Sequence, residues 1–174
     1  MASIIGVNEL QHTSGTTAAT IAADGKIKPA ASGSVVAVRH YSNATRATIY
    51  SSAAGTIWTF TDTKLYGAES SIIIHANIIG FYDNSGAVGT YIEYDGTKSY
   101  SISYTYTSYD TPKLLIGTSK TTGKAAGSRT VKIGWDVANG GAGESPFVTV
   151  NPNGNDDARI PQMVSTIIVY EVIA

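Results

Sequence analysis

Histidines and carboxylates are the side chains of this sequence that could perform catalysis or hold a metal ion. The three histidines are His12, His40 and His75, and none has the HxH or HExxH spacing that brings two imidazoles to one metal. No G-x-S-x-G motif accompanies them to mark a nucleophilic serine. The absence of cysteine excludes thiolate zinc sites, iron–sulfur clusters and cysteine nucleophiles. We interpret the histidines as surface or hydrogen-bonded side chains.

Two pairs of carboxylates are close enough in sequence to suggest the chemistry of glycoside hydrolysis. Glu93 and Asp95 share one face of a predicted strand end, which we interpret as the solvated end of a hairpin. Asp156 and Asp157 lie in a predicted turn that they would cap. The oxygen ligands of residues 153–157 would also suit calcium, but their spacing is not that of an EF-hand loop. The sequence therefore predicts no catalytic residue, no metal and no cofactor, in a protein that is not an enzyme.

The composition limits the partners of the protein. The 174 residues include 12 Lys+Arg and 13 Asp+Glu, a net charge of −1, which provides no basic surface for nucleic acid or an anionic membrane. Charged residues make up only 14%, against 18 Ser and 21 Thr, so hydroxyls form the polar faces. The most apolar stretch, residues 72–79, is too short to cross a membrane. The first residues do not resemble a signal peptide, so we expect synthesis and assembly in a cytoplasm.

Alternation with a period of two residues predicts an all-β protein. Residues 56–61, 100–107 and 129–136 each place apolar or aromatic side chains on one face and polar ones mainly on the other. Residues 72–79 and 165–173 are almost continuously β-branched, which is typical of strands buried on both faces at the centre of a sandwich. Turn sequences such as Asp95-Gly96 separate these segments. The spacing of the strands favours a β-sandwich or barrel.

The composition changes near residue 32. The first 32 residues contain no aromatic residue and few large aliphatic ones, whereas every Tyr, Trp and Phe follows Ser34. This change predicts an extended, β-rich N-terminal docking arm over residues 1–32 and a sandwich domain over residues 33–174. So few apolar groups cannot build a separate core, so we expect the arm to pair with another chain.

The tyrosines are concentrated in one part of the sequence. Seven of the eleven lie between Tyr82 and Tyr109. A tyrosine ring is common both in strands and at interfaces, so strand packing and partner contact remain equal interpretations. The aromatic residues that we expect to face another subunit or a ligand are Tyr100, Tyr104, Tyr106, Trp58 and Trp135.

Two segments resemble proteins of tailed-bacteriophage particles. Val7–Thr17, continuing to Ile21 and Asp24–Ile27, resembles the leader of many such virion proteins. Ser165–Val172 is similar to the closing strand of their C-terminal β-sandwich, a jelly roll of the trimeric tumour-necrosis-factor and C1q type. The resemblance implies a homotrimeric jelly roll on the virion surface, either as a capsid decoration (cement) protein or as a fibre tip.

Two functions follow from this resemblance. The first is a decoration protein whose trimer binds the major capsid protein or another virion protein through Ile4, Ile5, Val7 and Leu10 of the three arms, which gain avidity together. The alternative is a head- or tail-fibre tip that binds a host surface glycan, since aromatic faces stack on sugar rings.

Overall fold

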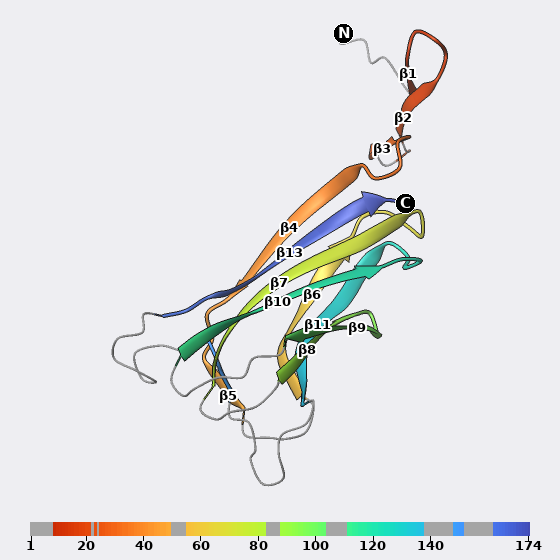
Figure 1. The fold of residues 1–174 in the computed structure, drawn as a ribbon. Helices are drawn as coiled ribbons and strands as arrows, with labels where there is room; N and C mark the ends of the chain where they lie inside the picture. Colours follow the sequence, from red (N-terminus) through yellow and green to blue (C-terminus); the bar gives the residue numbers. More distant parts are fainter. Residues whose placement is uncertain are drawn as a thin grey trace, which may run out of the picture.

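The structure is a computed structural model that describes residues 9–21, 23, 25–49, 55–82, 88–103, 111–137, 148–151 and 162–174. These residues form an all-β fold, as the alternation predicts (Figure 1). The strands are β1 (Glu9–Gln11), β2 (Thr17–Ile21), β3 (Ile27–Pro29), β4 (Val35–Asn43), β5 (Ala47–Ile49), β6 (Gly55–Lys64), β7 (Ser70–Tyr82), β8 (Val88–Tyr94), β9 (Thr97–Ser103), β10 (Thr111–Thr121), β11 (Gly127–Val137), β12 (Val148–Val150) and β13 (Ser165–Ile173).

Two antiparallel sheets form the sandwich. One sheet has the order β4-β13-β7-β12-β5, and β10 pairs with the edge of β7 opposite to β13. The other sheet has the order β6-β11-β8-β9. Figure 1 shows β4, β13, β7 and β10 side by side, with β6, β11 and β8 in a separate layer. A third, small sheet, β1-β2-β3, lies beyond one end of the sandwich.

The pairing of the eight long strands is that of a jelly roll. Strand β4 pairs with β13, β6 with β11, β7 with β10, and β8 with β9, so the first strand meets the last and each later pair nests inside. This nested order distributes the pairs alternately between the two sheets, which is the arrangement of a jelly roll. The innermost hairpin turns at Asp95 and Gly96, whose φ angles of 48° and 80° fit a two-residue turn. The predicted jelly-roll sandwich is therefore confirmed.

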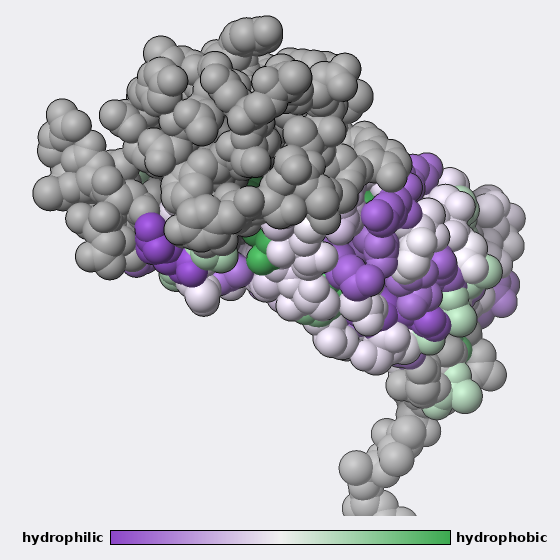
Figure 2. Space-filling model, turned by 90° about the horizontal axis from the view of Figure 1, so that it is seen from below, coloured by the Kyte–Doolittle hydropathy of each residue, from purple (hydrophilic) through white to green (hydrophobic). Residues whose placement is uncertain are grey.

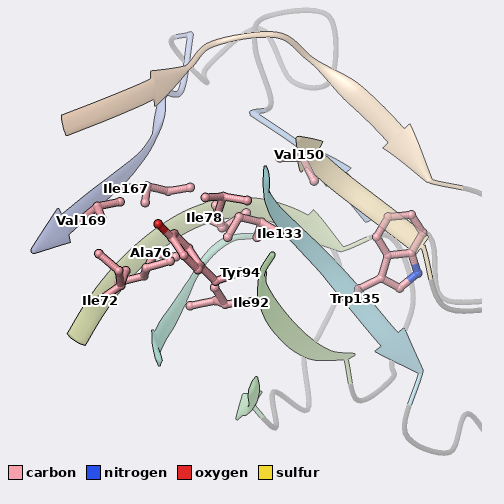
Figure 3. Close-up of a cluster of buried hydrophobic side chains, with 12 residues drawn as sticks. Ile72, Ala76, Ile78, Ile92, Tyr94, Ile133, Trp135, Val150, Ile167 and Val169 are labelled. Atoms are coloured by element: carbon pink, nitrogen blue, oxygen red, sulfur yellow. The ribbon is translucent and has the colours of Figure 1, made fainter. Parts of the chain in front are cut away.

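The apolar core lies between the two sheets. Alternate residues of β7, β8, β11 and β13 point inward and are almost completely buried (Figure 3). The buried members are Ile72, Ile74, Ala76, Ile78, Ile92, Tyr94, Val131, Ile133, Trp135, Val150, Ile167 and Val169. Burial of this apolar surface is the main source of stability that such a fold has, because the chain contains no disulfide.

Strands β7 and β13 differ from the prediction in one respect. Both are central in their sheet, as expected, but only one face of each is buried. Along β13, fully buried residues alternate with half-buried ones, and in β7 His75 is exposed. The prediction of burial on both faces is therefore wrong for these strands within the described chain, because their second face points away from the core.

The N-terminal segment is β-rich, as predicted, but residues 9–29 pair with one another instead of extending. Strand β2 pairs with β1 on one edge and with β3 on the other. The chain reverses near Gly15 and Gly25, both with φ of +80°, a conformation that glycine adopts without strain. These two glycines are the sequence signal for the reversals.

Candidate functional site

The end of the sandwich nearest the N-terminal sheet has a charged interior. Strands β4, β6 and β13 direct Arg39, Asp62, Lys64 and Glu171 inward, at positions where alternation elsewhere places apolar residues. Asp62 and Glu171 are 0% exposed and Lys64 is 1% exposed. We call these four residues the ionic cluster.

Asp62 is held on both carboxylate oxygens. Arg39 donates from Nε to Oδ1 at 2.5 Å and from Nη2 to Oδ2 at 3.0 Å, a two-pronged pairing that fixes both side chains. The hydroxyls of Tyr41 and Tyr94 donate to the same carboxylate at 2.7 and 3.2 Å. The hydrogen bond from Tyr94 links β8 to β6 within the second sheet. The hydrogen bonds from Arg39 and Tyr41 link the same carboxylate to β4 of the first sheet.

Glu171 holds a connecting segment as well as two cations. Its carboxylate accepts from the backbone N–H of Leu65 at 2.9 Å and of Tyr66 at 2.7 Å, and from the hydroxyl of Ser70 at 2.8 Å. Arg39 Nη1 and Lys64 Nζ lie 3.3 and 3.6 Å from its oxygens.

Lys64 completes the arrangement from the other side. Its ammonium donates to the carbonyls of Tyr66 and Gly67 and to Ser70 Oγ. The cluster therefore holds residues 65–70 against the end of β13. Its two positive and two negative charges balance.

The pKa shifts in this region follow from burial and from Asp62. Burial raises the pKa of Tyr41 to about 12, with the hydrogen bond and the charge of Asp62 acting in the same direction. Burial also raises the pKa of Tyr94, and Asp62 adds to that rise. Burial lowers the pKa of Lys64, partly opposed by Glu171. Burial acts to lower the pKa of Arg39, but the hydrogen bond and charge of Asp62 outweigh it and raise the pKa.

Residues 65–69 connect this cluster to the N-terminal sheet. The hydroxyl of Tyr66 donates to the carbonyl of Ile27 at 2.6 Å, and Lys26 Nζ donates to the carbonyl of Leu65 at 3.2 Å. Lys28 Nζ and Glu69 approach to 3.9 Å as an exposed ion pair. Residues 65–69 are thus bound to Glu171 of the ionic cluster and also form hydrogen bonds to the N-terminal sheet.

A cavity of about 360 Å³ lies at this junction. Thr20, Lys28 and Pro29 line it from the N-terminal sheet, and Glu69, Ile173 and Ala174 line it from the sandwich. Because alternate residues of a strand point to opposite faces, Thr20 and Lys28 place the polar face of the small sheet toward the sandwich.

The apolar face of the small sheet consequently points away from the sandwich. The register places Leu10 and Pro29 on either side of Ala19, and Ile27 beside Ile21. Leu10 is 46% exposed and Ile27 is 54% exposed. Between them Ala19 is only 8% exposed, so the exposed part of this face consists of Leu10 and Ile27. The structure therefore leaves the predicted anchor Leu10 exposed, whereas the other three, Ile4, Ile5 and Val7, lie outside the described residues.

The predicted aromatic surface is only partly described. Tyr104 and Tyr106 lie outside the described residues, and of Tyr100 only the backbone, in β9, is described. Trp135 is 8% exposed and belongs to the core, at the edge of the cluster drawn in Figure 3. Trp58 is half-buried and packs on the core, with its ring centroid 4.9 Å from that of Phe60. Contact of these aromatics with a partner or a glycan stays a prediction.

The carboxylates of the predicted hairpin end are engaged in ion pairs. Lys132 Nζ donates to Glu93 Oε1 at 2.9 Å, and Arg129 Nη1 donates to Asp95 Oδ2 at 3.1 Å. Lys124 adds a hydrogen bond to the carbonyl of Asp95 at 2.9 Å. The other candidates, Asn153 to Asp157, lie outside the described residues.

The histidines lie at separate places. His12 is exposed in the turn after β1, where its Nδ1 lies 3.1 Å from Ser14 Oγ. His40 and His75 are exposed on β4 and β7, and His75 Nδ1 lies 2.9 Å from Thr118 Oγ1 of β10. Within the described residues, no three His, Cys, Asp or Glu side chains are grouped so as to hold a metal ion. The described residues also contain no helix long and apolar enough to cross a membrane.

Sequence reasoning missed the ionic cluster. The signal was present in the alternation, since Glu171 lies on the same face of its strand as Ile167 and Val169. Asp62 and Lys64 likewise continue the inward face of Phe60. A charge on a face that is otherwise apolar indicates a buried, paired group.

No protein-family model and no curated protein matches this chain. Among solved structures, a mutant VP2 protein of infectious bursal disease virus in derived T=1 particles is 16% identical with a TM-score of 0.44, covering 89% of this chain and 40% of that one. The VP2 subviral particle of the same virus is 17% identical with a TM-score of 0.44, covering 89% and 42%. The virus of the Gx strain is 17% identical with a TM-score of 0.43, covering 85% and 39%. This chain thus spans less than half the length of these proteins.

Proposed function

We propose that this protein is a structural component of a virus particle, and specifically a homotrimeric capsid decoration protein on a phage head. The observation that carries the proposal is the N-terminal sheet, which the ionic cluster and residues 65–69 fasten to one end of the jelly roll with its apolar face turned outward. A small sheet that leaves two large apolar side chains, Leu10 and Ile27, exposed is suited to docking.

The contacts around the N-terminal sheet support the view that the sandwich holds this sheet in position for docking. Tyr66 and Lys26 hold it at its β3 end, next to the C-terminal residue Ala174. Leu10, on β1, projects from the opposite edge of the same sheet. On the face drawn in Figure 2, the described residues are mainly of intermediate hydropathy or hydrophilic, and the hydrophilic ones gather in patches.

A trimer would multiply a weak contact. Three short apolar faces that bind three sites together gain avidity from their high effective concentration, without a strong individual contact. In this proposal Ile4, Ile5, Val7 and Leu10 anchor each copy on the major capsid protein or on another virion protein.

The test is binding to shells assembled from the major capsid protein in the absence of this chain. Purified full-length protein is mixed with such shells and the bound fraction is measured by sedimentation. We expect removal of residues 2–12 to abolish binding and Leu10→Asp to weaken it by about tenfold or more, because a carboxylate cannot be buried in an apolar contact without a partner.

A matched control separates docking from folding. Gln11→Asp introduces the same charge at the neighbouring position of β1 and should bind like the unchanged protein. Undiminished binding of both the truncated protein and Leu10→Asp would contradict the docking role of the arm.

A further inference from the structure

The outer face of the β4-β13-β7-β10 sheet carries unusually apolar side chains. Tyr170 of β13 lies between Val38 of β4 and Ile73 of β7 in the register, and Ile168 of β13 lies in the next row. Val38 is 59% exposed, whereas Ile73, Ile168 and Tyr170 are half-buried by their neighbours in the sheet. We call these four residues the apolar strip.

The outer face of the other sheet provides an internal reference. There β6 presents Thr59, Thr61 and Thr63 to solvent, and β11 presents Thr130 opposite Thr61. Lys132 and Glu93 form an ion pair on the same face. Over β6 and β11 this face is what an antiparallel sheet with one solvated side normally shows, with apolar residues inside and polar ones outside. On β8 the same face also carries Tyr91, which is almost completely buried.

The apolar strip breaks that rule on strands of the same sandwich. The alternation of β13 would permit Thr or Lys at positions 168 and 170 at no cost to the core, as β11 has at positions 130 and 132. A contiguous apolar surface in water marks a contact with another molecule. The ring of Tyr170 meets His75 edge-on, with centroids 5.5 Å apart, and this contact fixes the position of the ring on the face.

Charge and size favour a second copy of this chain as the occupant. Among the described side chains of the face, the charged or titratable ones other than Tyr170 are Lys120, His40 and His75, and no carboxylate is present. A nearly neutral face can meet another neutral surface of the same chain without like-charge repulsion. Four strands of about nine residues present a flat area on the order of 600 Å². A stable interface takes roughly 800 Å² per partner, so the contact would need the whole face and not the apolar strip alone.

We infer that the apolar strip, Val38, Ile73, Ile168 and Tyr170, is the surface through which copies of this chain assemble into the oligomer. This inference deepens the proposed function and rests on its oligomeric part alone. The apolar face of the N-terminal sheet then stays available for the shell, so self-assembly and docking use different surfaces.

The experiment measures the mass of the full-length protein in solution by light scattering after size exclusion, without shells. We expect the unchanged protein to exceed the 18.2 kDa of one chain. Val38→Glu and Ile168→Glu should raise the dissociation constant by about tenfold or more, because each places an unpaired carboxylate in the contact. Thr61→Glu, at an exposed position of β6 on the other sheet, should leave the mass unchanged.

Each other result overturns the inference. A single-chain mass for the unchanged protein at tens of micromolar would show that the strip does not join copies. If that monomer bound shells and Val38→Glu reduced the binding, the occupant would be the shell protein. An oligomer that survives both strip substitutions, or one that Thr61→Glu dissociates equally, would place the interface elsewhere. The shell-binding test with Leu10→Asp reports on the proposed function independently, and circular dichroism shows that each variant is folded.

Discussion

The interior of the sandwich has two regions of opposite chemistry along the same strands. In β13, Ile167 and Val169 are followed on the same face by Glu171, and in β6, Phe60 is followed by Asp62 and Lys64. The first region is stabilised by area removed from water, about 25 cal/mol per Å². The second is stabilised only when every charge has its partners, because an unpaired buried charge is very costly.

This difference predicts how the stability of each region should respond to substitution. An apolar region loses stability in proportion to the volume removed, and it tolerates conservative replacements. The ionic cluster should fail abruptly when one member is lost, because the remaining charges stay buried. The predictions below test this contrast, from the largest expected effect to the smallest.

Glu171→Ala should destabilise the protein by about 3–5 kcal/mol. The substitution leaves Lys64 and Arg39 with an excess of buried positive charge and removes the acceptor of the Leu65 and Tyr66 N–H groups. Urea denaturation followed by circular dichroism measures the free energy of unfolding.

A double-mutant cycle with Lys64→Met identifies the cause. The loss in Glu171→Ala/Lys64→Met should be smaller than the sum of the two single losses, because the pair is removed together. Strictly additive losses would mean that the charges of the cluster do not act as a unit.

Tyr41→Phe should cost about 1.5–3 kcal/mol at neutral pH, since it removes a hydrogen bond to the charged Asp62. It should also change the response to alkali. The pKa of Tyr41 is raised to about 12 in the fold, against about 10 for an unperturbed tyrosine.

The sign of this pH dependence follows from the raised pKa. Between pH 10 and 12 the unfolded chain releases the Tyr41 proton and the folded chain keeps it, so stability falls as pH rises. The melting temperature should fall less steeply across this pH range for Tyr41→Phe than for the unchanged protein. Equal slopes would show that Tyr41 is not held in the cluster.

Ile167→Val should cost only about 0.5–1.5 kcal/mol, although Ile167 is 0% exposed. The change removes one methylene and leaves no unpaired group. Urea denaturation under the same conditions allows a direct comparison with Glu171→Ala. A loss as large as that of Glu171→Ala would remove the distinction between the two regions.

Lys132→Ala should have the smallest effect. Its ion pair with Glu93 lies on the solvated outer face of β11, where salt and water screen it. We expect an unfolding midpoint within experimental error of the unchanged protein, in low and in high salt. A clear loss that salt abolishes would show that surface charges matter here as much as buried ones.

The strands and the jelly-roll class were predictable because their signals are local. The alternation around Val131 and Ile133 and the Asp95-Gly96 turn each involve neighbouring residues, and the structure confirms them. The partner of each strand was not predictable from the residues, since β4 and β13 pair although Arg39 and Glu171 are 132 residues apart in the sequence.

The ionic cluster was missed for the same physical reason. Arg39, Asp62 and Glu171 are far apart in the sequence and become one network only when β4, β6 and β13 are assembled. Leu10 was predicted as an arm anchor from its type and its place in the arm, and that role stays a prediction. The structure adds that Leu10 is exposed and that Gly15 and Gly25 lie where its segment folds into a sheet.

The ionic cluster also has a consequence for how this protein can change over generations. Because an unpaired buried charge is costly, we expect Arg39, Asp62, Lys64 and Glu171 to be replaced in compensating combinations, so that these four positions vary together among descendants of the same ancestor. Ile167 and Val169 can drift independently among β-branched residues. A relative that has lost Glu171 should therefore also have lost the positive charge at Lys64, and that joint inheritance would identify the fold in sequences too divergent to align elsewhere.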